Sequence, residues 1–123
     1  MIQGIDVVFI HSPYKELIDW YAGVLGLEKG FSDPEWTEFL MQGVTRFAVE
    51  QTNYPRSVVE NQPIMISFRV AEIHEAVTTL SERGVRFFPS LADTIFDTGP
   101  SLVATFQDPA GNWLQISQRK AAQ

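Results

Sequence analysis

The chain has 123 residues, of which 45% are hydrophobic and 20% are charged, a balance that is typical of one folded domain and excludes a disordered segment. Its 15 acidic and 9 basic residues give a net charge of −6, which argues against nucleic-acid binding, because that function needs a basic surface. The chain contains no cysteine, so disulfides, thiolate metal sites and a cysteine nucleophile are excluded.

The N-terminal sequence, MIQGIDVVFIHSP, lacks the basic segment and long apolar run of a signal peptide. No apolar run approaches the roughly 20 residues that a membrane span needs. We therefore expect a cytoplasmic protein with no membrane partner.

The first half of the chain predicts a strand, a helix and three more strands. Residues 5–10 (IDVVFI) are β-branched and aromatic, as in a buried strand. Ser12 and Pro13 favour a helix start, and Gly26 favours the helix end. Short strands are expected at roughly 27–31, 35–41 and 45–50, and the polar residues 51–62 are expected to form a linker.

The second half predicts the same succession. We expect a strand at 64–70 (IMISFRV), a helix at 72–83 that ends at Gly84, and a strand at 85–89. A loop at 90–100 precedes two last strands, at 101–107 and 112–117, and residues 119–123 form a polar tail.

The order βαβββ thus occurs twice, at an offset of about 59 residues. The predicted fold class is α+β: two βαβββ modules form a curved mixed sheet around a cleft, with the helices on the outer face. We expect a single domain over residues 1–123, with module one at 1–50, a linker at 51–62, module two at 63–118 and a tail at 119–123.

Two short motifs, taken with the doubled order, point to a family. WYAGVLGL at 20–27 and DPAGNWLQI at 108–116 resemble segments of the vicinal oxygen chelate superfamily, which contains glyoxalases, bleomycin resistance proteins and extradiol dioxygenases. In the DPAGN turn, Pro109 presets its own φ, Gly111 can adopt a positive φ, and Asp108 can accept hydrogen bonds from nearby amides. We expect this turn to aim the last strand into the cleft.

Metal-using members of that superfamily hold a divalent ion with four side chains. Carried over position by position, the resemblance places these ligands at Asp6, near Ala48, at Met65 and at Gln115. Alanine cannot bind a metal, a thioether is a poor partner for a hard ion, and a glutamine is a weak neutral ligand. We therefore predict no family-type metal site and no cofactor.

The remaining positions predict a small-molecule pocket. If side chains alternate along each strand, one face carries Asp6, Val8, Met65, Ser67, Arg69, Trp113, Gln115 and Ser117, and the helices cover the opposite face, with Val7, Phe9, Ile66, Phe68, Val70, Leu114 and Ile116. Trp36, Glu38 and Leu40 are expected to face the same pocket. The candidate ligand-binding residues are Asp6, Trp36, Glu38, Met65, Arg69, Trp113 and Gln115.

Several of these residues have two readings. Asp6 binds a ligand or acts as a base, or else it pairs with Arg69 or hydrogen-bonds to Gln115 and Ser117. Arg69 binds an anion or ends in solvent. Trp36 and Trp113 stack on a flat or cationic ligand, or they fill space. His11 and His74 lie in no metal-ligand motif and are expected to be structural or on the surface.

Two functions follow from the resemblance. The first is a metal-free protein that binds a small antibiotic-like molecule or aromatic metabolite, as bleomycin resistance proteins do. The second is a lyase, isomerase or dioxygenase-type enzyme with an altered metal site, in which Asp6 or Glu38 is the acid or base. The sequence leaves open whether the protein is an enzyme. Members commonly pair, so a homodimer is expected.

Overall fold

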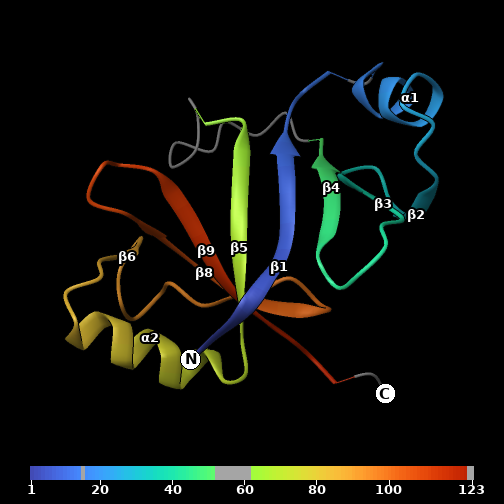
Figure 1. Ribbon diagram of the computed structural model, residues 1–123. Coiled ribbons are helices and arrows are strands. Elements are labelled where there is room, and N and C mark those ends of the chain that lie inside the picture. The colour runs from blue at the N-terminus through green and yellow to red at the C-terminus, as the bar shows by residue number, and fades with distance from the viewer. Residues whose placement is uncertain (15, 52–61, 122–123) are drawn as a thin grey trace. The chain divides into compact units, whose positions relative to one another are not determined.

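A computed structural model describes residues 1–14, 16–51 and 62–121 (Figure 1). The chain divides into two compact units. The N-terminal unit is Val7–Met65, and the C-terminal unit joins Met1–Asp6 to Ile66–Gln123. The first and fifth strands therefore each contribute residues to both units.

The N-terminal unit contains β1 (Ile2–His11, from Val7 onward), α1 (Glu16–Gly23), β2 (Lys29–Ser32), β3 (Trp36–Phe39) and β4 (Arg46–Glu50). Its strand order is β2–β3–β4–β1. Strands β1 and β4 run parallel, whereas β3 is antiparallel to β4 and to β2. Helix α1 packs through Tyr21, whose ring contacts Phe39 and Phe47 at centroid distances of 5.8 and 5.2 Å.

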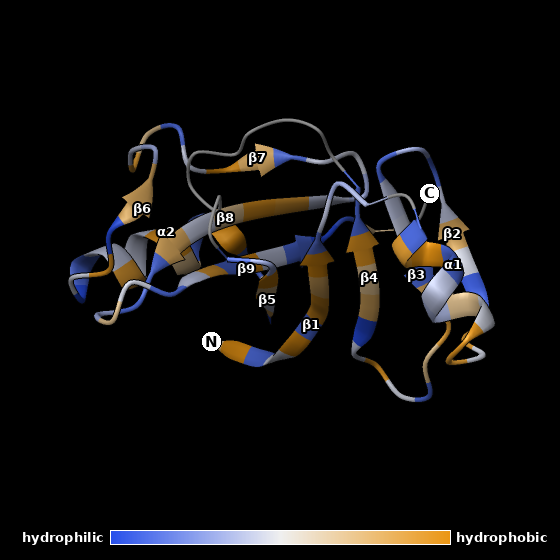
Figure 2. Ribbon diagram, turned by 90° about the horizontal axis from the view of Figure 1, so that it is seen from above, coloured by the Kyte–Doolittle hydropathy of each residue, from blue (hydrophilic) through white to orange (hydrophobic). Residues whose placement is uncertain are grey.

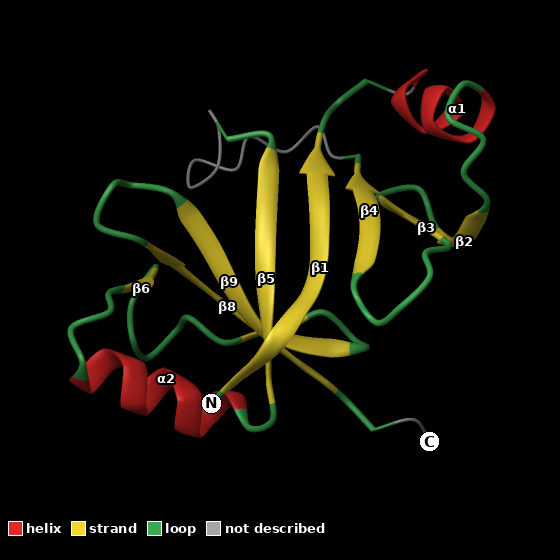
Figure 3. Cartoon of the chain, in the orientation of Figure 1, coloured by secondary structure: helices red, strands yellow, loops and turns green. Residues whose placement is uncertain are grey.

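The C-terminal unit contains β5 (Ile64–Val70, from Ile66 onward), α2 (Ile73–Glu82), β6 (Phe87–Phe88), β7 (Phe96–Asp97), β8 (Ser101–Gln107) and β9 (Trp113–Arg119), as Figure 3 shows by element type. The order is β5–β9–β8–β6, and β7 also pairs with β8. Here too the first strand runs parallel to the last, and the last is antiparallel to its other neighbour. This shared plan confirms the predicted α+β class and the doubled βαβββ module.

The hydrophobic core of the C-terminal unit lies under α2. Ile73, Ala76 and Val77 of the helix are buried against the sheet, which contributes apolar side chains from four strands: Val70, Phe87, Ala104 and Ile116. Figure 2 shows the apolar stretch of β8 that faces this packing. The helix begins where the Glu72 carboxylate accepts a hydrogen bond from His74 N and ends at Gly84, whose φ is +95°.

Most element bounds agree with the sequence-based prediction. Strands β5 and β8 match residue for residue, whereas β1 is longer at both ends than 5–10 and β9 continues to Arg119, inside the predicted tail. The predicted loop 90–100 contains the short strand β7. Most of the predicted linker, residues 52–61, lies outside the described part of the chain. None of the described helices is long and apolar enough to cross a bilayer.

One prediction of side-chain direction is wrong. Phe9 was expected under the helix of its module, but its ring lies 5.0 Å from that of Trp36, on the side of the sheet opposite to Phe39 and Tyr21. The alternation rule fails to assign this strand because apolar side chains are suited to both of its faces. In the C-terminal unit the rule holds, since Phe68, Val70 and Ile116 all pack with α2.

Candidate functional site

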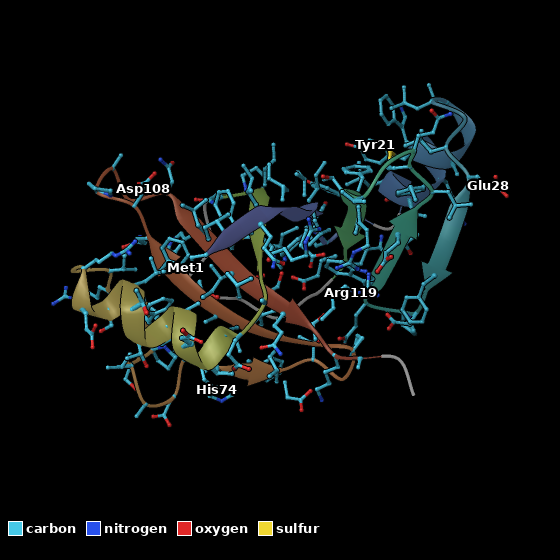
Figure 4. The ribbon with its side chains drawn as sticks, turned by 60° about the horizontal axis from the view of Figure 1, so that its bottom comes forward. Met1, Tyr21, Glu28, His74, Asp108 and Arg119 are labelled. Atoms are coloured by element: carbon cyan, nitrogen blue, oxygen red, sulfur yellow. The ribbon has the colours of Figure 1, made fainter. Side chains whose placement is uncertain are left out.

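The DPAGN segment forms the tight turn that sets the direction of β9. Asp108 Oδ1 accepts hydrogen bonds from Ala110 N and Asn112 N, both at 2.9 Å, and Gly111 has a φ of +90°. The hydrogen bonds from the side chain and backbone of Asn112 lower the pKa of Asp108. In Figure 4, Asp108 marks the start of this strand region and Arg119 its far end.

Away from α2, the sheet of the C-terminal unit presents a polar face. We define it by the side chains that alternate toward this side: Asp6, Ser67, Arg69, Thr105, Trp113, Gln115, Ser117 and Arg119. At its centre is a buried chain of hydrogen bonds. Ser67 donates to Ser117 Oγ at 3.0 Å, and Ser117 donates to Asp6 Oδ2 at 2.9 Å.

This chain shows one group to which the Asp6 side chain is bonded. The carboxylate is 2% exposed, and the Ser117 hydroxyl supplies one of the hydrogen bonds that such a buried group requires. The predicted bond to Ser117 is therefore present. The alternative pairing with Arg69 is not adopted, because that guanidinium is directed to the backbone oxygen of Gln3.

Gln115 and Trp113 occupy the part of the polar face nearer the turn. In the strand register, Gln115 lies between Ser67 on β5 and Thr105 on β8. The Trp113 ring packs edge-on against Phe88, with 4.7 Å between the ring centroids. Both side chains are half-buried.

The N-terminal unit carries a second polar face, opposite to α1. Glu38 Oε2 accepts hydrogen bonds from Trp36 Nε1 at 3.0 Å and from Arg46 at 2.8 Å. Trp36 and Glu38 thus share one face, as predicted, but their polar atoms are already bonded to each other. Leu40 follows them at the end of the strand and is 58% exposed.

A histidine–carboxylate pair on this second face was missed from the sequence. His11 Nδ1 lies 3.0 Å from Glu50 Oε1, and both side chains are mostly buried. The two residues are 39 positions apart and meet because β1 and β4 are parallel neighbours with His11 opposite Glu50. The available signal was that each residue ends a predicted strand, since parallel strands end at the same edge.

The positions where the family resemblance implies a metal do not supply a suitable donor set. Ala48 and Met65 are buried apolar residues, and Asp6 is engaged by Ser117. Gln115 contributes only a neutral amide. Among residues 1–14, 16–51 and 62–121, no group of three or more histidine, cysteine, aspartate or glutamate side chains is placed to hold a metal ion.

The C-terminal unit also has two hollows away from these residues. One, of about 580 Å³, lies along the loop that follows α2, between Ser81 and Leu91. The other, of about 380 Å³, lies beside the start of α2 and includes Met1 and Glu75. Neither is lined by any of the seven predicted ligand-binding residues.

Comparison with known proteins identifies relatives of this geometry. A sequence model of the Glyoxalase/Bleomycin resistance protein/Dioxygenase superfamily matches residues 7–116. No curated protein sequence matches the chain significantly.

Solved structures with the same fold include three bacterial proteins at low sequence identity. The Streptomyces coelicolor methylmalonyl-CoA epimerase, in a variant bound to 2-nitronate-propionyl-CoA, has a TM-score of 0.76 and 14% identity, over 98% of this chain and 100% of that one. The Mycobacterium tuberculosis methylmalonyl-CoA epimerase has 0.74 and 15%, over 98% and 90%. A hypothetical protein from Bacillus halodurans has 0.74 and 18%, over 97% and 96%.

Proposed function

Because the chain belongs to the Glyoxalase/Bleomycin resistance protein/Dioxygenase superfamily, we propose that it is a metal-free member that binds a small antibiotic-like molecule or aromatic metabolite. The observation that carries this proposal is the hydrogen-bond chain from Ser67 through Ser117 to Asp6. A carboxylate at the position of a metal ligand is bonded instead to a neutral hydroxyl group. A protein-bound cation would compete with that hydroxyl for the same oxygen atoms.

The groups around this chain are suited to an organic ligand. Trp113 offers an aromatic surface that Phe88 supports from one side, and the neighbouring Gln115 offers an amide donor and acceptor. Trp36 and Glu38 are candidate ligand residues in the N-terminal unit, and Met65 is a further candidate. An apolar or aromatic wall with a few fixed polar groups is the usual composition of a small-molecule site.

Metal content is the first test. The purified protein is dialysed against Zn²⁺, Ni²⁺, Mn²⁺ or Fe²⁺, and the bound metal is measured by elemental analysis. We expect substoichiometric metal in every case. One metal ion per chain that is lost in an Asp6→Ala, Gln115→Ala double variant would overturn the proposal.

Ligand binding is the second test. Thermal unfolding is followed in the presence of aromatic metabolites and cationic glycopeptide antibiotics, because a ligand that binds the folded state raises the melting temperature by mass action. A shift that disappears in Trp113→Ala but persists in a control such as Phe96→Ala supports the polar face as the site. Phe96 is a suitable control because it is 65% exposed. Absence of any shift across the panel counts against the binding function.

An enzyme with an altered metal site is the second candidate, and the His11–Glu50 pair favours it. A carboxylate at Nδ1 orients an imidazole so that its Nε2 can exchange protons, an arrangement used in general acid–base catalysis. The named epimerases among the structural neighbours supply one substrate to try. Methylmalonyl-CoA is incubated with the protein in D₂O, with and without added metal, and loss of the proton signal is followed. Exchange that His11→Gln abolishes would favour the enzyme over the binding protein.

A homodimer and a cytoplasmic location belong to the same proposal. In the N-terminal unit, α1 and the β2–β3 region expose large apolar side chains, including Trp20, Leu25 and Phe31, which a second copy of the chain would cover. Analytical ultracentrifugation tests the dimer, and a concentration-independent monomer would exclude it. Fractionation of cells that express the protein tests the location.

A further inference from the structure

The guanidinium group of Arg69 lies over Gly4 of β1, where no side chain obstructs it. A Cβ atom on Gly4 would lie 3.0 Å from Arg69 Nη2. Gly4 also has a φ of +148°, which residues with side chains rarely adopt. The glycine therefore leaves room for a guanidinium group to lie over the strand, on the polar face.

The hydrogen-bonding capacity of this guanidinium is largely unused. Arginine has five N–H donors. Among the described residues, the Arg69 side chain makes one hydrogen bond, to Gln3 O, and its length of 3.5 Å is at the limit for such a bond. Arg69 is nevertheless half-buried. A partly desolvated cation without an anion is unfavourable, so the site favours an anionic partner.

Arg119 adds a second positive charge to the same place. Arg69 is paired in register with Ser117, and Arg119 follows two positions later on the same face of β9. This spacing sets the two Cα atoms about 8 Å apart, within reach of a shared ligand. Arg119, at the end of β9 in Figure 4, makes no side-chain hydrogen bond or ion pair with any residue that the structure describes.

Two other cations of the protein are ion-paired. Lys120 Nζ lies 2.6 Å from an Asp97 oxygen, and Arg46 lies 2.8 Å from a Glu38 oxygen. Arg69 and Arg119 have no acidic partner among the residues that the structure describes. The mutual repulsion of two neighbouring arginines is relieved when an oxyanion binds between them.

We propose that Arg69 and Arg119 bind the carboxylate or phosphate group of an aromatic ligand whose ring contacts Trp113. The inference rests on the proposed binding function and names the chemistry of its ligand. Ser117, the register partner of Arg69, lies four positions after Trp113, so the two Cα atoms on β9 are about 13 Å apart, and a ligand of about that length is needed. Gln115 and Thr105 lie along that path, and their polar side chains can hydrogen-bond to the middle of a ligand.

The experiment uses a probe of that length and a neutral analogue. Binding of phenyloctanoate and of its uncharged amide to the full chain is measured by isothermal titration calorimetry. We expect the carboxylate to bind about tenfold more tightly than the amide or better, because charge-assisted hydrogen bonds are worth more than neutral ones. In Arg69→Gln, the ratio of the affinities for the carboxylate and the amide should fall toward one. In Arg119→Gln, this ratio should fall partway.

The matched control is Arg86→Gln. It removes the same charge from an exposed arginine that lines the hollow along the loop after α2, away from the polar face. It should leave the preference unchanged, and circular dichroism checks that every variant is folded. Arg69→Lys keeps the charge but loses the planar donor fork, and it should recover part of the preference. Inorganic phosphate should compete with phenyloctanoate in the wild type and not in Arg69→Gln.

Two outcomes would overturn the inference. Equal affinity for the acid and the amide, unchanged in Arg69→Gln, would show that the arginines do not bind the acidic group of the ligand. The proposed binding function would still stand. Binding of neither compound would also overturn the inference. The metal analysis described above decides the proposed function separately, because it does not depend on either arginine.

Discussion

The two units have one strand order but differ in how the helix is held and in how the polar face is charged. In the C-terminal unit, α2 buries three residues in the core, and the polar face combines a buried hydrogen-bond chain with two arginines that form no ion pair with any described residue. In the N-terminal unit, α1 has no fully buried residue, and the charges of its polar face are paired: Glu38 with Arg46, and Glu50 with His11. The plan of a module therefore does not dictate its chemistry. Of the two polar faces, that of the C-terminal unit carries described arginines without an ion-pair partner, which is why we infer ligand recognition there.

The largest expected effect concerns the helices. Ile73 is fully buried in the core under α2, so Ile73→Ala should lower the free energy of unfolding by about 2–5 kcal/mol. Ile18→Ala in α1 removes the same atoms from a half-buried position and should cost less than half as much. Urea denaturation measures both losses. Equal losses would mean that the two helices are held alike.

Next in size is the hydrogen-bond chain. Ser117→Ala removes the hydroxyl that joins Ser67 to the Asp6 carboxylate, and the loss should be about 1–3 kcal/mol, because a buried charged acceptor loses a donor. Ser67→Ala leaves the bond to Asp6 in place and should cost about 1 kcal/mol or less. The same denaturation assay compares the two variants. If Ser67→Ala cost more than Ser117→Ala, the chain would not be organised around Asp6.

The charge pair of the N-terminal unit should contribute less. Glu38→Gln keeps an oxygen acceptor for Trp36 but removes the negative charge beside Arg46, and we expect a loss of about 1 kcal/mol or less, since both side chains are partly exposed. The loss should shrink in 1 M NaCl, which screens the pair. A loss that high salt leaves unchanged would indicate that packing, rather than charge, holds Glu38.

The smallest effect should come from the turn before β9. The pKa of Asp108 lies below its ordinary value of 3.8 because Asn112 hydrogen-bonds to the carboxylate. The ionised form thus stabilises the fold, and that contribution is complete above pH 3.8 and is lost as the pH falls through the lower, folded-state pKa. Asp108→Asn should be less stable than the wild type at pH 7, and the difference should close in acid. If Asp108→Asn remained less stable than the wild type at pH 2, ionisation of Asp108 would not be the cause of the difference.

Much of this fold was readable from the sequence because local signals agreed. The segments IMISFRV and SLVATFQ predicted β5 and β8 without error, and DPAGN predicted the turn before β9. The sequence did not show on which face of the sheet Phe9 lies, because an apolar side chain is suited to either face of β1. Strand β7 has two residues inside a loop and pairs only through β8, so no local pattern marks it.

The candidate site was predicted less completely than the fold. Asp6 and Gln115 were predicted because the resemblance places metal ligands at their positions, and Trp113 was predicted from the alternation of side chains along its strand. The partners of these residues depend on contacts between distant segments: the Asp6–Ser117 bond joins residues 111 positions apart, and Arg69 lies over Gly4. Such contacts follow from strand register and close backbone approach, which a single sequence does not encode locally.

The division of the chain inside β1 bears on how such a protein can be cut or recombined. Met1–Asp6 belongs to the unit formed by the second module, although it is translated with the first. A fragment that contains only module two would lack Asp6, and Ser117 would lose its acceptor. Exchange of modules at the 51–62 junction would likewise separate Asp6 from Ser117. A cut that preserves this hydrogen bond has to keep Met1–Asp6 together with the second module.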